Sequence, residues 1–329
     1  MQIGKVPNSL LRELVINKNK KVNGRVLLSA GVGEDFGVID FGDECCIVSG
    51  DPVTGAVKQA GKVAVHVACN DIATCGVAPV AILTTLLLPP GATEAELGAL
   101  ADEIADAADS LGVCVIGGHT EVTDAVNRIV ISVTAIGAAR RGAYITTGGA
   151  KTGDSLIMTK SAGIEGAAII ALERGDDLDR RFGPGLAERA RLLSDELSVV
   201  KEGVIAGAYG AHAMHDVTEG GVYGAAWEMA EASDRGIIIN KGDIHILDET
   251  REICAYYKID AYRLISSGSM LIATGDPDGL MDILTKSGIA ASRIAIFTEN
   301  PDERLIYGGN TYEKLGQPEP DELYKVIGR

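Results

Sequence analysis

The pattern of apolar and polar residues changes its period repeatedly along the first half of the chain. A run of small apolar residues at Ala60–Gly76 predicts a buried helix. On either side of it, short runs rich in β-branched and apolar residues predict strands at Arg25–Ser29, Val38–Phe41, Cys46–Ser49, Val80–Leu88, Val113–Ile116 and Ile129–Ile136. The first half is therefore expected to alternate between strands and helices.

A further helix of this half is predicted to begin at Thr93. The hydroxyl of Thr93 and the carboxylate of Glu96, three residues later, have the spacing of a capping box. The apolar residues that follow recur at helical spacing: Leu97, Leu100, Ala101, Ile104, Ala108 and Leu111. This is the most strongly marked helix start in the chain.

The second half repeats the mixture after a polar, glycine-rich stretch at Thr146–Gly153, which predicts a domain boundary. Strands are predicted at Ser155–Thr159, Gly236–Ile239, Ser269–Thr274 and Ile294–Phe297. Helices are predicted at Ile164–Leu172, Leu186–Glu196, Gly221–Ala232 and Leu247–Tyr256, and after the Asp276-Pro277 start signal as far as Gly288. We expect an α/β or α+β protein with two similar-sized domains, residues 1–148 and 149–329.

Composition limits the partners of this chain. Its 329 residues include 46 acidic and 30 basic side chains, for a formal net charge of −16, so we expect neither nucleic acid nor an anionic membrane as a partner. The start has no secretory-signal pattern, and the longest apolar stretch, Val77–Pro90, is too short to span a bilayer. Six cysteines without a CxxC pair indicate reduced thiols, so we expect a cytoplasmic protein.

Acidic residues gather in the glycine-rich loops of the first half. Asp35 directly precedes a predicted strand, and Asp51 follows another. Carboxylates at strand ends beside flexible backbone can ligate hard divalent cations. The alternative is that these aspartates only favour turns. The acids of this region are Glu34, Asp35, Asp40, Asp43, Glu44, Asp51 and Asp71.

Asp71 differs from the others because it lies inside the predicted apolar helix. An ionised aspartate in a buried helix costs several kcal/mol unless it is paired or bound to a metal. None of its neighbours at helical spacing is basic. We therefore expect a cation or a ligand from elsewhere in the molecule, with a water-facing Asp71 as the alternative.

A double glycine, Gly117-Gly118, follows the predicted strand Val113–Ile116. Two glycines at a strand end let the backbone approach a phosphate or turn tightly. His119 and Glu121 are then candidates for the same site. A simple turn with a solvated glutamate is the alternative.

A second glycine-rich turn, at Asp216–Gly221, precedes a predicted helix. Free N–H groups and the helix dipole at such a start attract anions, so Gly220 and Gly221 are candidates for phosphate binding. The segment has neither the Rossmann nor the P-loop spacing.

The acidic chain begins with a basic leader, in which Lys5 follows a glycine. A segment of this kind could fold over a polyphosphate. The alternative for most of its basic residues is a solvated amphipathic helix around Ser9–Val15.

Together these segments resemble the aminoimidazole ribonucleotide (AIR) synthase-like superfamily, and most of all its HypE-like, AIR-synthase-related members. The superfamily includes AIR synthase, thiamine-monophosphate kinase, selenophosphate synthetase and the hydrogenase-maturation protein HypE. The segments that carry the resemblance occur in order over almost the whole chain: GVGEDFGVID, SGDPVTG, NDIATCG, GGHTEVT, MHDVTEGGVYGA and SSGSMLIAT.

The resemblance implies an N-terminal mixed sheet that pairs with the sheet of a second subunit in a homodimer. It also implies ATP bound near that interface, with Mg²⁺ held by Asp35, Asp51 and Asp71. The residues assigned to the nucleotide are Lys5, Asp51, Asn70, Gly117, Gly118, Gly220 and Gly221. The residues assigned to catalysis are His119, Glu121 and Asp216.

Two departures from the superfamily pattern stand out. Several relatives have an acid directly after the double glycine, where this chain has His119, a poor ligand for Mg²⁺. HypE proper ends in an acceptor cysteine, whereas the last cysteine of this sequence is Cys254. We therefore expect the acceptor to be a small molecule or the thiol of a partner protein.

The leading hypothesis is a Mg²⁺-dependent, ATP-using enzyme that activates an amide- or carbonyl-type oxygen by phosphoryl transfer. One alternative is a non-catalytic maturation partner of the same fold. The other is AIR synthase itself, in purine synthesis.

Overall fold

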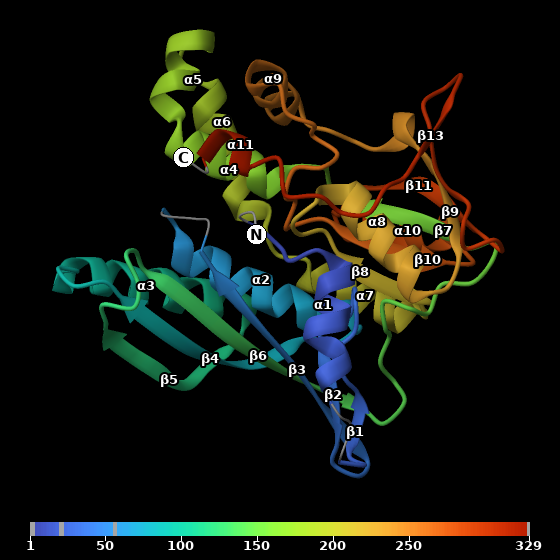
Figure 1. The fold of residues 1–329 in the computed structure, drawn as a ribbon, viewed down its shortest axis with the longest axis horizontal. Helices are drawn as coiled ribbons and strands as arrows, with labels where there is room; N and C mark the ends of the chain where they lie inside the picture. Colours follow the sequence, from blue (N-terminus) through green and yellow to red (C-terminus); the bar gives the residue numbers. More distant parts are fainter. Residues whose placement is uncertain (1–3, 20–22, 55–57, 328–329) are drawn as a thin grey trace.

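The fold is described from a computed structural model for residues 4–19, 23–54 and 58–327. Two β-sheets form the centres of the two halves of the molecule (Figure 1). Helices cover one face of the first sheet and both faces of the second. The expected mixed α/β class is confirmed. No helix of the described residues is apolar and long enough to cross a membrane.

The first sheet has six strands in the order β1-β2-β3-β6-β4-β5. Its strands are β1 (Val26–Leu28), β2 (Gly37–Asp40), β3 (Glu44–Val53), β4 (Pro79–Leu88), β5 (Cys114–Val122) and β6 (Val130–Arg140). The β4–β5 pair is parallel and every other pair is antiparallel. Inward-facing residues such as Ile47, Ile82 and Val133 pack against α2 (Ala60–Thr74) and α3 (Glu94–Leu111). The predicted capping box at Thr93 is present at the start of α3.

The edge of the first sheet is unusually exposed. All nine residues of β5 are exposed. Several exposed side chains on β4 and β5 are apolar: Val80, Leu83, Val115, Ile116 and Val122. An exposed apolar patch of this kind is typical of a surface that another protein covers.

The second sheet has seven strands in the order β13-β12-β9-β11-β7-β10-β8. Its strands are β7 (Ser155–Thr159), β8 (Ala213–Asp216), β9 (Gly236–Asn240), β10 (Met270–Thr274), β11 (Ala291–Thr298), β12 (Arg304–Tyr307) and β13 (Tyr312–Lys314). The remaining α-helices are α1 (Asn8–Leu14), α4 (Ile164–Glu173), α5 (Gly175–Phe182), α6 (Leu186–Leu192), α7 (Val200–Tyr209), α8 (Gly221–Ala232), α9 (Asp248–Tyr257), α10 (Pro277–Lys286) and α11 (Tyr324–Ile327). Three short 3₁₀ helices lie at Ile16–Lys18, Leu193–Glu196 and Lys241–Asp243.

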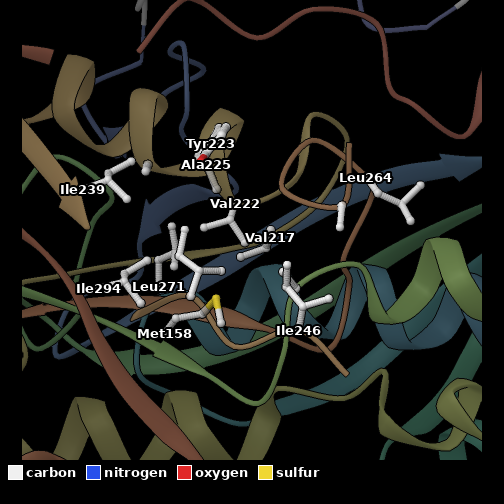
Figure 2. Close-up of a cluster of buried hydrophobic side chains, with 14 of the residues drawn as sticks. Met158, Val217, Val222, Tyr223, Ala225, Ile239, Ile246, Leu264, Leu271 and Ile294 are labelled. Atoms are coloured by element: carbon white, nitrogen blue, oxygen red, sulfur yellow. The ribbon is translucent and has the colours of Figure 1, made fainter. Parts of the chain in front are cut away.

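Every residue of β7 is buried because both faces of this sheet are covered. Met158 lies in the core on the α8 side, where Figure 2 shows it near Val217 and Leu271. Ile157 points to the opposite face, which α7 and α10 cover. A strand buried on both faces has no alternation of apolar and polar residues, in agreement with the continuous apolar run in the sequence.

The two halves meet where α7 packs on α2. Close contact is possible because α7 has small residues here: a Cβ on Gly203 would lie 2.3 Å from the carbonyl oxygen of Ala73. The sequence analysis did not predict α7. Both faces of this helix are covered, one by the second sheet and the other by α2, so its apolar residues do not form a single stripe. The domain boundary at residue 148 stays a prediction.

Candidate metal and nucleotide site

Four aspartates from separate parts of the chain lie together between the two halves, and we call them the acid cluster. Asp35 comes from the loop before β2, Asp51 from β3, Asp71 from α2 and Asp216 from the end of β8. Carboxylate atoms of Asp35 and Asp216 lie within 4.8 Å of each other. Burial raises the pKa of Asp71 well above its usual range, and the charges of the other three aspartates raise it further. The three predicted metal ligands are therefore neighbours, and Asp216 joins them.

Asp216 is the aspartate of the acid cluster whose carboxylate is least balanced by hydrogen-bond partners. Its side chain is 0% exposed, and both carboxylate oxygens are buried without a hydrogen-bond partner among the described residues. Burial and the charge of Asp35 raise the pKa of Asp216 to about 8. A buried carboxylate without partners is costly, so this position is suited to a cation.

Asp71 is held in place by its surroundings. The hydroxyl of Ser49, on β3, donates a hydrogen bond to the Asp71 carboxylate. Asp51 lies two residues further along β3 on the same face, and its charge raises the pKa of Asp71. The alternation of side chains along β3 therefore presents Ser49 and Asp51 together to α2, which carries Asp71.

Two cationic side chains accompany the acid cluster. The ammonium group of Lys5 donates to the hydroxyl of Thr218 at 3.1 Å. Burial lowers the pKa of Lys5, but nearby carboxylates, including those of Asp51 and Asp216, outweigh this effect and raise it overall. The expected position of Lys5 beside the site therefore agrees with the structure.

The second cation is His215, which the sequence analysis did not single out. Its Nδ1 lies 2.8 Å from a carboxylate oxygen of Asp35, and its Nε2 lies 3.2 Å from one of Glu228, on α8. Burial lowers the pKa of His215, but these two carboxylates raise it well above its usual value, which favours the charged imidazolium form. The same contacts lower the pKa of Glu228 to about 2 against the effect of burial. Adjacency to Asp216 was the only sequence signal for this residue.

The donor atoms at the cluster fit a hard divalent cation. Among the described residues, at least seven carboxylates gather here, against the positive charges of Lys5 and His215: those of Glu34, Asp35, Asp51, Asp71, Asp216, Glu219 and Glu228. Without a further cation, the raised pKa values of Asp51, Asp71 and Asp216 favour their protonated forms. Magnesium prefers oxygen ligands of this type, and Asp216 has both oxygens available.

Asn70, which we expected to bind the nucleotide, has a different role. Its amide group donates to the carbonyl of Leu197 at 2.8 Å and accepts from the N–H of Val199 at 2.8 Å. Both polar atoms of the side chain are therefore used in a contact between α2 and the second half. Sequence position next to Asp71 was misleading because adjacent helix residues point in different directions.

The double-glycine segment lies apart from the acid cluster within one chain. Gly118 is inside β5 and not in a turn after it, and a Cβ there would lie 1.9 Å from the carbonyl oxygen of Thr84. Gly118 and Asp51 lie in the same row of paired residues across the first sheet, three strands apart. Their backbones are therefore separated by about 14 Å. His119 and Glu121 are exposed and contact each other at 3.1 Å. The structure therefore does not bring this predicted catalytic pair to the acid cluster.

The glycine-rich start of α8 already holds an anion from the chain itself. Gly220 donates its N–H to the carboxylate of Asp321 at 2.8 Å, and Gly221 donates to the carbonyl of Thr218 at 3.0 Å. These N–H groups are not free, contrary to our expectation. The anion preference of this helix start was correctly predicted, but its partner lies about a hundred residues away in sequence.

Comparison with known families matches both halves of the chain. Residues 33–139 match the N-terminal domain of AIR synthase related proteins, and residues 151–308 match the C-terminal domain of the same family. The chain belongs to the AIR synthase related family. The resemblance that the sequence motifs indicated is therefore confirmed.

Three curated relatives show which members of the family this chain is similar to. A putative hydrogenase expression/formation protein of Methanocaldococcus jannaschii is 29% identical over 84% of this chain and 81% of its own length. Carbamoyl dehydratase HypE of Cupriavidus necator is 25% identical over 67% of this chain and 62% of its own length. Thiamine-monophosphate kinase of Pyrococcus horikoshii is 27% identical over 68% of this chain and 70% of its own length.

Solved structures share the fold at low sequence identity. A chain of a HypE–HypF complex has a TM-score of 0.77 at 19% identity and covers 94% of this chain and 100% of its own. A HypE solved in complex with ATP has a TM-score of 0.69 at 18% identity and covers 97% and 96%. At these identities the structures confirm the two-domain fold.

Proposed function

We propose that this protein is a HypE-like, magnesium-dependent enzyme that uses ATP to activate an amide- or carbonyl-type oxygen by phosphoryl transfer. The observation that carries the proposal is the acid cluster, in which residues of both halves meet around the unpartnered carboxylate of Asp216. The family gives further support, because relatives are named as a carbamoyl dehydratase and a kinase, and one HypE structure contains ATP.

Asp35, Asp51, Asp71 and Asp216 would hold the magnesium ion. The ion would neutralise the negative charge of the phosphates as the phosphoryl group moves. The chain itself holds Asp71 and Asp35 in position through Ser49 and His215, and it buries Asp71 and Asp216. Phosphoryl transfer depends mainly on such positioning and on electrostatics.

No thiol beside the cluster is activated as a nucleophile. Cys69 lies near Asp71, but burial raises the pKa of its thiol to about 12, which keeps it neutral. Burial raises the pKa of Cys254 to about 12 as well. We therefore propose that the acceptor is a small molecule or the thiol of a partner protein, bound by a homodimer in the cytoplasm.

Thermal unfolding with a non-hydrolysable ATP analogue tests the proposal. The wild type should be stabilised when Mg²⁺ and the analogue are both present, and EDTA should remove the shift. Asp71→Asn should lose most of the shift, whereas Asp302→Asn, an exposed control, should keep it. No shift in the wild type would refute nucleotide use.

Two further outcomes separate the alternatives. Binding without phosphate release in the presence of a metabolite panel, together with a stable protein complex from cell extract, would favour the non-catalytic partner. Ring closure of formylglycinamidine ribonucleotide would favour AIR synthase.

A further inference from the structure

A cavity of about 1050 Å³ lies at the junction of the two halves, between α2, α3 and α7. Lys62 and His66 of α2 line it from the first half, and Asp195, Ser198 and Val200 line it from the second. None of the four aspartates of the acid cluster lines it. A volume of this order is typical of a pocket for a small organic molecule. A molecule bound there would contact both halves of the chain.

Two helices give this cavity apolar walls. Ala107 and Leu111 lie four residues apart on α3, and Val200 and Val204 lie four residues apart on α7. This spacing puts each pair on one face of its helix. Val204 is 36% exposed, so part of the apolar wall is open to solvent. The walls are therefore suited to the apolar body of a ligand.

Two lining residues also have buried polar atoms without a hydrogen-bond partner. These atoms are Nδ1 of His66 and Oε1 of Gln59, and neither has a partner among the described residues. His66 is only 7% exposed. Burial and the charge of Lys62 lower the pKa of His66 to about 4, which favours the neutral ring, with one N–H donor and one acceptor nitrogen. Because unpaired buried polar atoms are costly, His66 is suited to a ligand group that forms hydrogen bonds.

The charged residues of the lining disfavour an anionic ligand. Both lysines among them already have protein partners, because Lys62 is paired with Asp195 at 2.5 Å and Lys201 donates to a backbone carbonyl at 2.5 Å. Two further acids, Glu103 and Asp106, lie on the α3 wall. Within the described lining, three carboxylates therefore face two ammonium groups. A phosphate or carboxylate would meet a negative field here.

We propose that this cavity binds a small, uncharged and mainly apolar molecule whose hydroxyl or amide group forms a hydrogen bond with His66. The apolar body lies between α3 and α7. The ligand strengthens the junction of the two halves, because it contacts α2 and residues 195–200, the segment whose backbone Asn70 also binds.

Fluorescence titration of the full-length protein with naphthalene probes tests the site. 2-Naphthol combines an apolar body with a hydroxyl, 2-methylnaphthalene has nearly the same shape without a polar atom, and 2-naphthoate is an anion. 2-Naphthol should bind with a dissociation constant of about 0.1 mM, as expected for a ligand of its size. 2-Naphthoate should show no saturable binding. Absence of 2-naphthol binding would overturn the site, and equal affinity for 2-naphthoate would overturn the preference for an uncharged ligand.

His66→Phe tests the polar contact. Phenylalanine keeps an aromatic ring and removes both nitrogens, so the affinity for 2-naphthol should fall about tenfold. The affinity for 2-methylnaphthalene should not fall, because this probe forms no hydrogen bond. An equal loss of affinity for the two probes would assign His66 a packing role and overturn its hydrogen bond with the ligand.

Val204→Glu tests whether the probes occupy this cavity. A charge on the apolar wall should abolish the binding of both 2-naphthol and 2-methylnaphthalene. Ile283→Glu is the matched control, because Ile283, on α10, is 37% exposed and does not line the cavity. The control should bind both probes as the wild type does. Unchanged binding by a Val204→Glu variant with the wild-type unfolding temperature would place the probes elsewhere and overturn the site. None of these measurements uses a nucleotide, so their outcome is independent of the proposed function.

Discussion

Replacing Asp216 by asparagine separates two effects of the acid cluster: the folding stability that it costs and the ligand binding that it provides. Asparagine has nearly the shape of aspartate but carries no charge, and its amide can donate to neighbouring carboxylates. We expect Asp216→Asn to stabilise the protein without divalent cations, because folding then no longer has to bury the Asp216 charge or protonate it, and to remove the stabilisation by magnesium nucleotide. A substitution that increases stability and abolishes ligand binding is typical of a site whose charges serve binding.

The size of the effect follows from the charges around Asp216. At the 4.8 Å limit between ligand atoms of Asp35 and Asp216, two unit charges interact by about 3.5 kcal/mol at an effective dielectric constant of about 20. Three aspartates repel the Asp216 carboxylate, while Lys5 and His215 attract it. Carboxylates outnumber the two cations, so at least one such repulsion is left uncancelled, and burial adds to it. We expect the free energy of unfolding to rise by about 3 kcal/mol in Asp216→Asn.

Urea and thermal unfolding in EDTA and in Mg²⁺ with a non-hydrolysable ATP analogue would measure both effects. In EDTA the variant should unfold about 4 °C above the wild type, as expected for about 3 kcal/mol in a chain of 329 residues. With ligand at about 100 times its dissociation constant, the wild type should gain about 2.7 kcal/mol and the variant almost nothing. Asp302→Asn should follow the wild type in both conditions.

Two results would refute this reasoning. If Asp216→Asn lowers stability in EDTA, the carboxylate has a stabilising partner that the structure does not show. If the variant keeps the full stabilisation by magnesium nucleotide, Asp216 is not a metal ligand.

Three further predictions concern other parts of the molecule. Asn70→Ala should lower the free energy of unfolding by about 3 kcal/mol in urea, because it leaves two buried backbone groups unpaired, whereas the exposed Asn310→Ala should change little. Burial raises the pKa of Glu165 to about 7 from 4.5, so the folded chain holds this proton more tightly than the unfolded chain, and the contribution of Glu165 to stability should be greatest below about pH 4.5 and fall as the pH rises to about 7. Glu165→Gln should remove about 3 kcal/mol of that fall between pH 4.5 and 8, and an unchanged pH profile would contradict the assignment. Ile116→Lys, on the exposed strand β5, should convert the proposed homodimer to monomers in sedimentation experiments, and a monomeric wild type would rule out this interface.

Local patterns in the sequence predicted much of the fold, because local physics determines them. The capping box at Thr93 and the proline start at Pro277 are interactions between residues close in sequence, and both are present. Helix α7 was missed because its contacts on both faces come from distant parts of the chain. The continuation of β5 through the double glycine was missed for a similar reason, since pairing with β4 stabilises this part of the strand.

The candidate site shows the same difference between residues with a local sequence signal and residues whose contacts come from distant parts of the chain. A charged residue inside an apolar helix is a signal in its own right, and the structure places Asp71 beside the other three aspartates. The role of Asn70 depends on a backbone segment more than 120 residues away, which no local pattern contains. The same holds for His215, whose two partners come from different elements of the chain. The proposed metal ligands left a trace in the sequence, whereas the residues that contact them from distant parts of the chain did not.

Anomalous diffraction from a crystal grown with Mn²⁺ and a non-hydrolysable ATP analogue would test the central proposal most directly. Manganese takes the same oxygen ligands as magnesium and scatters anomalously. We predict a manganese peak within about 2.5 Å of carboxylate oxygens of Asp71 and Asp216, with the triphosphate bound to the same ion. A nucleotide bound elsewhere, or a cluster that stays free of metal at saturating Mn²⁺, would contradict it.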